Sequence, residues 1–220
     1  MPSAIPVIAI DGPSASGKGT VAQKVAASLG FHCLDSGALY RLVALAAMRS
    51  KLPWSDETAL GELARALPVR FKDGDIFLNN KIVTEDIRSE TCSAGASIVA
   101  AMGTVREGLL ARQKGFRQAP GLVAEGRDMG SVVFPDAVLK VYLTASAEIR
   151  AERRLKQLKQ KGITARLAVL LRDLCERDAR DSSRSVAPLK PTQEARWLDT
   201  TALDIDPAVN QILLWYQESR

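Results

Sequence analysis

The first chemistry that the sequence suggests lies in a glycine-rich stretch near its start. The stretch directly follows the apolar run Val7–Ile10 and reads Gly12-Pro13-Ser14-Ala15-Ser16-Gly17-Lys18-Gly19-Thr20. Such a turn lets consecutive backbone N–H groups converge on phosphate oxygens, and a helix that follows it adds its positive N-terminal end. Lys18 supplies a mobile positive charge. The stretch therefore predicts a phosphate-binding loop between a strand and a helix.

One position departs from the general phosphate-loop pattern. That pattern has Ser or Thr immediately after the lysine, whereas here Gly19 intervenes and Thr20 follows it. A strand-to-helix turn that merely packs could have the same composition. Apolar residues spaced four apart after the loop predict a helix there and favour phosphate binding, namely Val21, Val25 and Leu29.

Two polar segments, Asp35–Arg41 and Glu125–Gly130, each come directly after a further apolar run. Ligands of open α/β sheets bind at the carboxyl ends of the strands, so both segments are candidates for a binding site. Each also has an ordinary explanation. Asp-Ser-Gly is a common turn and helix start, and Arg127 beside Asp128 could be a surface salt bridge on a turn.

A charged run, Glu176–Arg184, predicts an anion site. At 100° per residue, four of its charged residues fall within about 100° of one another on a helix, namely Arg177, Arg180, Asp181 and Arg184. Three guanidinium groups could then point at one place, where a phosphate would turn their mutual repulsion into bidentate attraction. A solvated helix face is the alternative.

The elements that must position these residues alternate between strands and helices. Short apolar runs predict buried parallel strands at Val7–Ile10, Phe31–Leu34, Leu122–Ala124, Val138–Leu143 and Trp197–Leu198. Helical patterns fill most of the intervals between them. The sequence therefore predicts an α/β fold with a central parallel sheet of about five strands flanked by helices.

Helix boundaries are readable in the second half of the chain. A helix is expected from about Ala147, with Ser146 as its N-cap and Gly162 as its stop. A further helix is expected from Thr164.

The segment 62–95 breaks this alternation. Three short runs and two turn pairs predict a small antiparallel meander, namely Val69–Lys72, Asp73-Gly74, Ile76–Leu78, Asn79-Asn80 and Ile82–Thr84. We expect 62–95 to be a subdomain inserted into one domain that spans 1–220.

Composition narrows the class of protein. A chain of 220 residues, 46% of them apolar, can bury one core. No apolar run approaches the roughly 20 residues that span a bilayer, and the start lacks the features of a signal peptide, so a cytoplasmic location without membrane contact is expected. Three separated cysteines, Cys33, Cys92 and Cys175, are expected to be small buried residues. His32 is the only histidine, which disfavours a histidine base.

The formal net charge of +5 could indicate either nucleic acid or phosphorylated small molecules. Basic and aromatic residues are not interleaved, and aromatic residues make up only 5% of the chain. We therefore expect no nucleic-acid partner. The protein is also expected to be a monomer.

Together these segments resemble the bacterial cytidylate kinase family. The resemblance covers nearly the whole chain and rests on Ile10–Thr20, Leu34–Arg41, Glu125–Gly130 continuing to Ala137, and Glu176–Leu189. It implies a P-loop kinase fold and an enzyme that uses ATP and Mg²⁺ to phosphorylate CMP and dCMP. A different small-molecule P-loop kinase, of the adenylate or shikimate kinase type, would share the loop and is the alternative.

For the phosphoryl donor, the resemblance implies that Gly12–Thr20 holds the ATP phosphates and that Thr20 contacts Mg²⁺. Lys18, Arg127 and Arg180 would act on the transferred group. At the strand ends Asp35 and Glu125 are both candidates to organise the metal.

For the acceptor, the resemblance assigns three residues to each part of CMP. The cytosine would face Ser36, Arg106 and Asp128, the monophosphate Arg41, Arg127 and Arg184, and the ribose Ser97, Arg177 and Asp181. The insert 62–95 would bind the monophosphate side, and 155–184 would act as a lid.

Cytosine chemistry fits the part implied for Asp128. A carboxylate accepts a hydrogen bond from the exocyclic amino group of cytosine, whereas uracil has a carbonyl at that position. A buried mismatch of this kind costs on the order of 1–3 kcal/mol, so CMP should be preferred over UMP.

Overall fold

The computed structural model describes residues 5–72 and 75–219 and divides into two compact units. One unit comprises the described residues of Met1–Leu34 and Phe116–Arg220, and the other is Asp35–Gly115. They are treated separately below.

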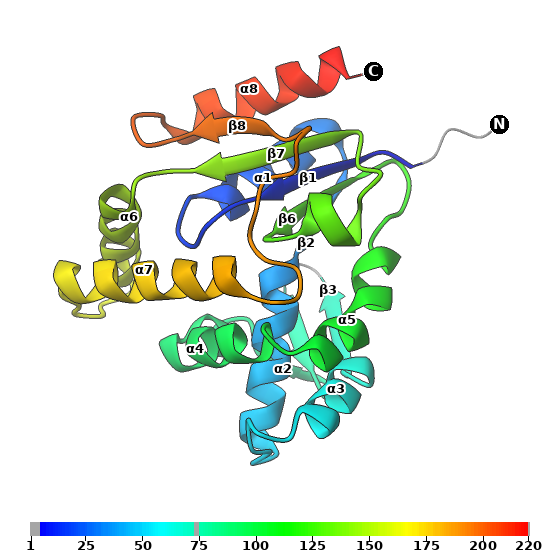
Figure 1. Ribbon diagram of the computed structural model, residues 1–220, viewed down its shortest axis with the longest axis vertical. Coiled ribbons are helices and arrows are strands. Elements are labelled where there is room, and N and C mark those ends of the chain that lie inside the picture. Colours follow the sequence, from blue (N-terminus) through cyan, green and yellow to red (C-terminus); the bar gives the residue numbers. More distant parts are fainter. Residues whose placement is uncertain (1–4, 73–74, 220) are drawn as a thin grey trace. The chain divides into compact units, whose positions relative to one another are not determined.

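A five-stranded sheet is the centre of the first unit (Figure 1). Its strands, in spatial order, are β2 (His32–Asp35), β6 (Leu122–Gly126), β1 (Val7–Asp11), β7 (Leu139–Thr144) and β8 (Arg196–Asp199). Parallel pairing joins β1 to both β6 and β7, and β7 to β8. The predicted parallel sheet is therefore confirmed, strand by strand.

Burial explains why the central strands are continuous apolar runs. All five residues of β1 are buried, as expected for a strand with neighbours on both edges and cover on both faces. Helices α1 (Lys18–Leu29) and α8 (Ile205–Glu218) pack with β1, β7 and β8 in one apolar core. This core holds the carboxyl end of β1, from which the glycine-rich loop emerges.

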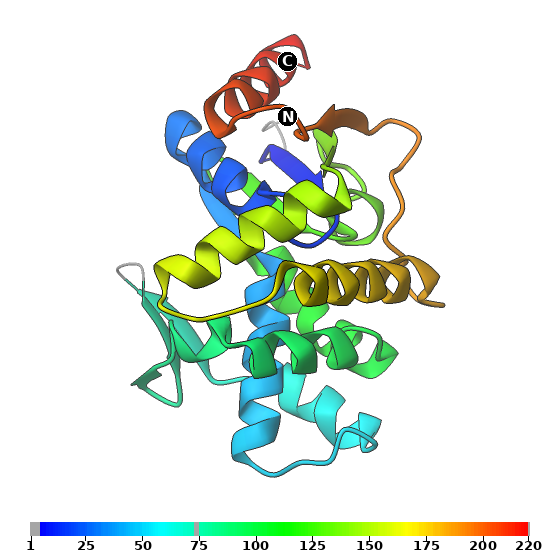
Figure 2. The ribbon, with the colours of Figure 1, turned by 90° about the vertical axis from the view of Figure 1, so that its left-hand side faces the viewer.

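Helices α6 (Ala147–Gln160) and α7 (Leu167–Ser183) lie side by side in the same unit (Figure 2). Ser146 caps α6 as predicted, because its Oγ accepts from the backbone N–H of Ile149 at 3.3 Å. The second helix begins at Leu167, not at Thr164, because Arg166 still has an extended backbone.

The described residues of the second unit form four α-helices and a small sheet. The helices are α2 (Ser36–Arg49), α3 (Glu57–Arg65), α4 (Glu90–Val99) and α5 (Gly103–Gly115), with a 3₁₀ turn at Asp86–Arg88. Within this unit α2 packs on α4, and α3 packs on α5.

The predicted antiparallel meander is present in this second unit. Its strands are β3 (Val69–Lys72), β4 (Asp75–Leu78) and β5 (Lys81–Ile82). Asn79 and Asn80 both have positive φ, 51° and 61°, the backbone of a tight hairpin turn. The other predicted turn, Asp73-Gly74, lies outside the described residues.

Two side-chain expectations fared differently. Cys92 is buried as predicted, but the prediction is wrong for Cys175, which is exposed on α7, and Cys33 is only half-buried. His32 lies on the edge strand β2, where its Nε2 is 3.0 Å from the carbonyl oxygen of Ala119.

No helix in the described part of the chain is both long and apolar enough to cross a bilayer.

Candidate active site

The glycine-rich loop connects β1 to α1, as predicted, and its backbone is unusual. Ala15 and Gly17 have positive φ, 58° and 92°. At Gly12 a Cβ atom would lie 2.0 Å from the carbonyl oxygen of Leu143, a distance that no side chain tolerates. Glycine is therefore required at Gly12 for the loop to run against β7 and turn into the helix.

Lys18 is the first residue of α1, and its side chain is buried. Its ammonium donates to the carbonyl oxygen of Pro13 at 3.1 Å and lies 3.7 Å from Oε2 of Glu125, at the end of β6. The lysine is thus held at the loop by a backbone acceptor and a carboxylate. A phosphate group would compete for the same charge.

The residue after the lysine makes room for that carboxylate. A Cβ atom at Gly19 would lie only 3.2 Å from Oε1 of Glu125, whereas Thr20 is exposed on α1.

Among the described residues there is no group of three or more His, Cys, Asp or Glu side chains that could hold a metal ion. Mg²⁺ at nucleotide sites is typically held by one or two protein oxygens together with phosphates and water, and Glu125 and Thr20 are oxygen-bearing side chains near Lys18 that can supply them.

Sequence reasoning missed the residues that anchor the loop from α6 and α7. Arg150 donates to the carbonyl oxygen of Ser14 at 3.0 Å and forms an ion pair with Asp178 at 2.6 Å. Asp178 also accepts from the backbone N–H of Ser14 at 3.4 Å. Arg153 donates to the carbonyl oxygen of Ser16 at 3.1 Å. An arginine inside the apolar stripe of α6 would have been the signal.

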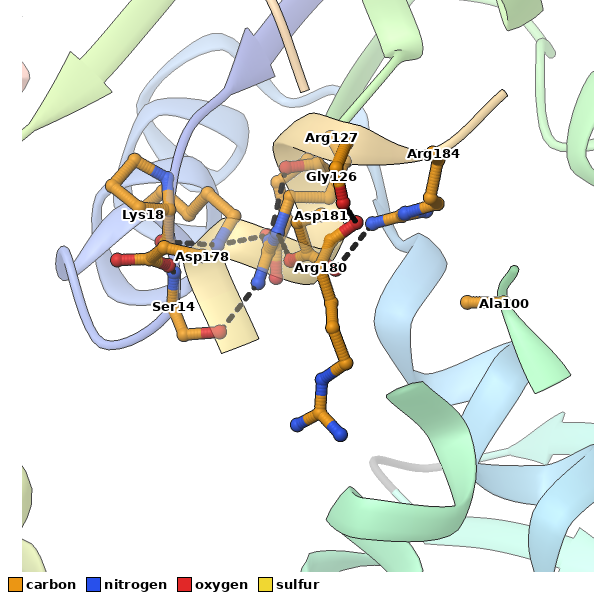
Figure 3. Close-up of polar contacts among 12 residues, drawn as sticks. Ser14, Lys18, Ala100, Gly126, Arg127, Asp178, Arg180, Asp181 and Arg184 are labelled. Atoms are coloured by element: carbon orange, nitrogen blue, oxygen red, sulfur yellow. Dashed lines mark hydrogen bonds and ion pairs between the residues drawn. The ribbon is translucent and has the colours of Figure 1, made fainter. Parts of the chain in front are cut away.

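Arg127 joins the loop to α7 (Figure 3). Its guanidinium donates to Oγ of Ser14 at 2.8 Å and to Oδ2 of Asp181 at 2.7 Å. The other oxygen of Asp181 accepts from Arg184. Asp181 therefore lies between two guanidinium groups in a largely buried cluster.

The charges in this cluster stabilise one another. Burial by itself would raise the pKa of Asp181, but the charges of Arg127 and Arg184 outweigh it and hold that pKa below its usual value. Burial by itself would lower the pKa of Arg127, but the carboxylates of Asp181, Glu125 and Asp178 together outweigh that effect and raise it. Both shifts favour the charged forms of Asp181 and Arg127, which stabilise each other.

The predicted convergence of three guanidinium groups on one helix face is wrong. Helix α7 ends at Ser183, so Arg184 lies beyond it with an extended backbone and turns back to Asp181. Arg180 is exposed, and its guanidinium extends away from Asp181 (Figure 3). The alternative of a solvated face therefore applies to Arg180 but not to Asp181 or Arg184.

Asp128 is buried, with only 2% of its surface exposed. It directly precedes a π-helical turn, Met129–Val133. The alternative of a surface salt bridge between Arg127 and Asp128 is wrong, because Arg127 pairs with Asp181 instead. A buried carboxylate beside the loop can accept hydrogen bonds from a ligand whose donor replaces water.

Asp11, at the end of β1, is a second buried carboxylate that sequence reasoning did not single out. It accepts from the backbone N–H groups of Met129 and Gly130, both at 2.8 Å. Desolvation raises the pKa of Asp11 to about 6, and the neighbouring charge of Asp128 adds to that rise, while the two N–H groups and Lys18 oppose it. An aspartate closing an otherwise apolar strand was the available signal.

Asp11 should make unfolding depend on pH. Because its pKa of about 6 in the folded chain lies above the ordinary 3.8, the folded state binds the proton more tightly, and its stability falls as pH rises between those values. Relative to Asp11→Asn, which cannot ionise, the unmodified protein should lose roughly 2–3 kcal/mol of unfolding free energy between about pH 4 and pH 7. Urea unfolding of both proteins across this range measures the difference, and a constant difference would contradict the assignment.

In the second unit, Asp35 organises the start of α2. It accepts from the backbone N–H of Ala38 at 2.9 Å and pairs with Arg41 at 2.7 Å. Ser36 is buried at the first position of this helix. The Arg41 guanidinium is therefore held by a carboxylate six residues before it, and a phosphate could take over that pairing.

Ser97 on α4 and Arg106 on α5 are both buried in this unit. The Oγ atom of Ser97 has no hydrogen-bond partner among the described residues. Arg106 donates to the carbonyl oxygen of Ala100 at 3.2 Å and lies over the ring of Tyr40, 5.8 Å from its centroid. A buried hydroxyl that lacks a partner is costly, which fits a group that meets a ligand.

Comparison with known proteins agrees with these features. The sequence profile of the cytidylate kinase family matches residues 8–218. A protein of Chromobacterium violaceum named cytidylate kinase is 58% identical over 216 residues, covering 98% of this chain and 97% of that protein. One of the same name from Burkholderia multivorans is 60% identical over 212 residues, covering 96% and 93%.

The fold has a counterpart among solved structures as well. A structure of an uncharacterised protein from Eubacterium ventriosum matches with a TM-score of 0.50 at 13% identity, covering 97% of this chain and 98% of that one, which bears on the fold alone. The sequence match over nearly the full chain, together with the loop at β1 and the charged cluster around Asp181, settles the relationship: this chain belongs to the cytidylate kinase family.

Proposed function

We propose that this protein transfers the γ-phosphoryl group of ATP to the phosphate of CMP or dCMP, giving ADP and CDP or dCDP. The observation that carries the proposal is the double contact of Arg127 with Ser14 and Asp181. One guanidinium thereby connects the loop proposed to hold the donor phosphates with the cluster proposed to hold the acceptor. Family membership favours this reaction over that of an adenylate or shikimate kinase.

On the donor side, the backbone of Gly12–Thr20 would bind the ATP phosphates, and Lys18 would follow the charge that develops on the transferred group. Arg127 and Arg180 would add positive charge from the acceptor side. Glu125 and Thr20 are proposed to hold Mg²⁺, which would neutralise charge on the ATP oxygens when bound. The burial of Lys18 supports this arrangement, because charges interact more strongly where water is excluded.

On the acceptor side, the proposed contacts are grouped by the part of CMP they meet. Cytosine would be read by Ser36, Arg106 and Asp128, the phosphate bound by Arg41, Arg127 and Arg184, and the ribose by Ser97, Arg177 and Asp181. Three observations support these assignments: the buried carboxylate of Asp128, the Oγ of Ser97 that has no partner within residues 5–72 and 75–219, and the carboxylate pairing of the phosphate-side arginines.

No general base is needed for this reaction. The second pKa of a phosphate monoester lies near 6, so the attacking oxygen of CMP is already ionised at neutral pH. It attacks the γ-phosphorus, the bond to the β,γ-bridging oxygen breaks, and ADP leaves with those electrons. The role of the protein is to position the two nucleotides, surround the moving group with positive charge and exclude water.

Four further features belong to the proposal. Residues 62–95 are proposed to bind on the monophosphate side, and 155–184 to act as a lid. The enzyme is proposed to work as a monomer in the cytoplasm. The contacts of Arg150 and Asp178 with Ser14 support the lid, because they connect α6 and α7 to the loop directly.

An acceptor panel tests the proposed activity. Purified protein with ATP and Mg²⁺ is assayed for ADP release with CMP, dCMP, UMP, AMP, GMP and shikimate. CMP and dCMP should give the highest kcat/KM. Faster turnover with AMP or shikimate would overturn the proposal in favour of the other kinase types.

Base recognition by Asp128 makes a separate prediction. Asp128→Ala removes the acceptor for the cytosine amino group, so the ratio of kcat/KM for CMP to that for UMP should fall by roughly 10- to 100-fold. The matched control is Asp136→Ala, because Asp136 is an exposed aspartate that pairs with Arg117. An unchanged ratio in Asp128→Ala would show that the base is read elsewhere.

A further inference from the structure

The turn that follows Asp128 is capped from a distant strand. Residues Met129–Val133 form a π-helical turn, and the side chain of Asp128, although it stands at the N-cap position, makes no capping hydrogen bond. Asp11, 118 residues earlier in the chain than Met129, performs that function. Each of its two oxygens accepts from one of the first two N–H groups of the turn.

The backbone carbonyl and the side-chain carboxylate of Asp128 play different parts in this turn. Its carbonyl oxygen accepts from the backbone N–H groups of Val132 and Val133, at 2.9 and 3.2 Å, and closes the turn. Its carboxylate, in contrast, is not used to cap the turn. The side chain of an aspartate at this position ordinarily caps the turn by accepting a hydrogen bond from one of its first N–H groups. The turn is therefore capped by Asp11 and not by the side chain of Asp128.

Packing fixes the turn to the central strands as well. A Cβ atom at Gly130 would lie 3.2 Å from Cγ of Lys140 on β7 and 3.5 Å from Cβ of Ala9 on β1. The turn therefore rests directly on these strands, and Asp11 holds it there by hydrogen bonds. Position and orientation of the residue before the turn follow from this attachment.

Capping the turn with Asp11 costs free energy, because this carboxylate is buried. Only 8% of its surface is exposed, and burial raises its pKa to about 6, so its ionised form is disfavoured by desolvation. The two N–H donors and Lys18 partly offset this cost. The negative charge of the nearby Asp128 carboxylate further disfavours the ionised form of Asp11. A carboxylate supplies two acceptor oxygens in one plane, which a neutral amide cannot do.

We propose that Asp11 is a positioning residue for base recognition: by capping the Met129–Val133 turn from β1, it orients the carboxylate of Asp128 toward the exocyclic amino group of the acceptor nucleotide. This inference rests on the proposed function, in which Asp128 reads cytosine. Asp11 does not touch either nucleotide in this proposal. Its effect should therefore appear in the choice of acceptor base and not in the binding of ATP.

The test is the nearly isosteric variant Asp11→Asn, which retains one acceptor oxygen and turns the other into a donor. The ratio of kcat/KM for CMP to that for UMP should fall by about tenfold, with KM for ATP changed less than about twofold. This ratio does not depend on how much of the sample is folded, because both substrates meet the same enzyme. Hydrogen exchange at the amides of Met129 and Gly130 should accelerate.

Comparison with Asp128→Ala separates the inference from the proposed function. If Asp128→Ala lowers the ratio and Asp11→Asn does not, Asp11 is not a positioning residue and base reading stands. If neither lowers it, base reading by Asp128 fails as well. The double variant should show the same ratio as Asp128→Ala alone, because Asp11 acts only through that carboxylate.

Folding of the Asp11 variants distinguishes a positioning residue from a purely structural one. If Asp11→Asn and Asp11→Ala both fail to fold, or if KM for ATP rises as much as KM for CMP, Asp11 is a structural cap for the whole loop region, and the proposal is overturned. A selective loss of the CMP preference in a folded protein supports it.

Discussion

Replacing Lys18 by alanine is expected to lower kcat by roughly 10²- to 10³-fold. Lys18 is the positively charged side chain of the loop, and its ammonium would stabilise the negative charge that develops on the transferred phosphoryl group. The ammonium is buried, and the carbonyl oxygen of Pro13 and the carboxylate of Glu125 hold it at the loop. Steady-state kinetics with CMP and ATP measure the effect.

The control for Lys18 lies on the same helix. Lys24 is exposed on α1 and pairs with Asp206, and Lys24→Ala should keep kcat within about twofold of the unmodified enzyme. Lys18→Ala also removes the ion pair with Glu125, so the free energy of unfolding should be measured in parallel. A near-normal kcat in folded Lys18→Ala protein would remove the lysine from the mechanism.

Replacing Arg180 by alanine is expected to lower kcat by about 10³-fold while leaving the protein as stable as before. Among the residues that the structure describes, the Arg180 guanidinium has neither a hydrogen-bond nor an ion-pair partner, and it extends away from the Asp181 cluster (Figure 3). An exposed arginine without partners contributes little to folding, and the free energy of unfolding should change by less than about 0.5 kcal/mol. Loss of rate without loss of stability would identify Arg180 as a residue that acts only during the reaction.

Two further variants sharpen the test of Arg180. Arg180→Lys keeps the charge but loses the planar fork, and it should recover only part of the rate. Arg172→Ala removes another exposed arginine of α7 and should leave kcat unchanged. If Arg172→Ala and Arg180→Ala have the same small effect, the net charge of the helix matters and the position of Arg180 does not.

Much of the fold was predictable because its signals are local. The apolar runs of β1 and β7, the cap at Ser146 and the Asn79-Asn80 turn each depend on neighbouring residues along the chain. Local signals were weaker where a helix ends. The serines at 182, 183 and 185 and Pro188 are weak signals for the end of α7, and extending the helix through Arg184 led to the wrong arrangement of the guanidinium groups.

The residues that hold the site together were beyond local reasoning. Arg127 and Asp181 are 54 residues apart, and Arg150 and Ser14 are 136 apart. Their charge types were visible, but which carboxylate would neutralise which arginine depends on how the strands and helices pack. The sequence singled out Arg127 and Asp181, included Asp178 in a charged run without giving it a role, and did not single out Arg150.

By itself, the sequence determined the strand order along the chain, the phosphate loop and the family, because each follows from short-range periodicity or from contiguous residues. Only the tertiary structure decided that Asp11 caps the turn after Asp128 and that Asp181 lies between Arg127 and Arg184. The physical reason is that a buried charge must find its partner in space. For Asp11 and Arg127 that partner lies on a distant element, brought near by the packing of the sheet and its helices.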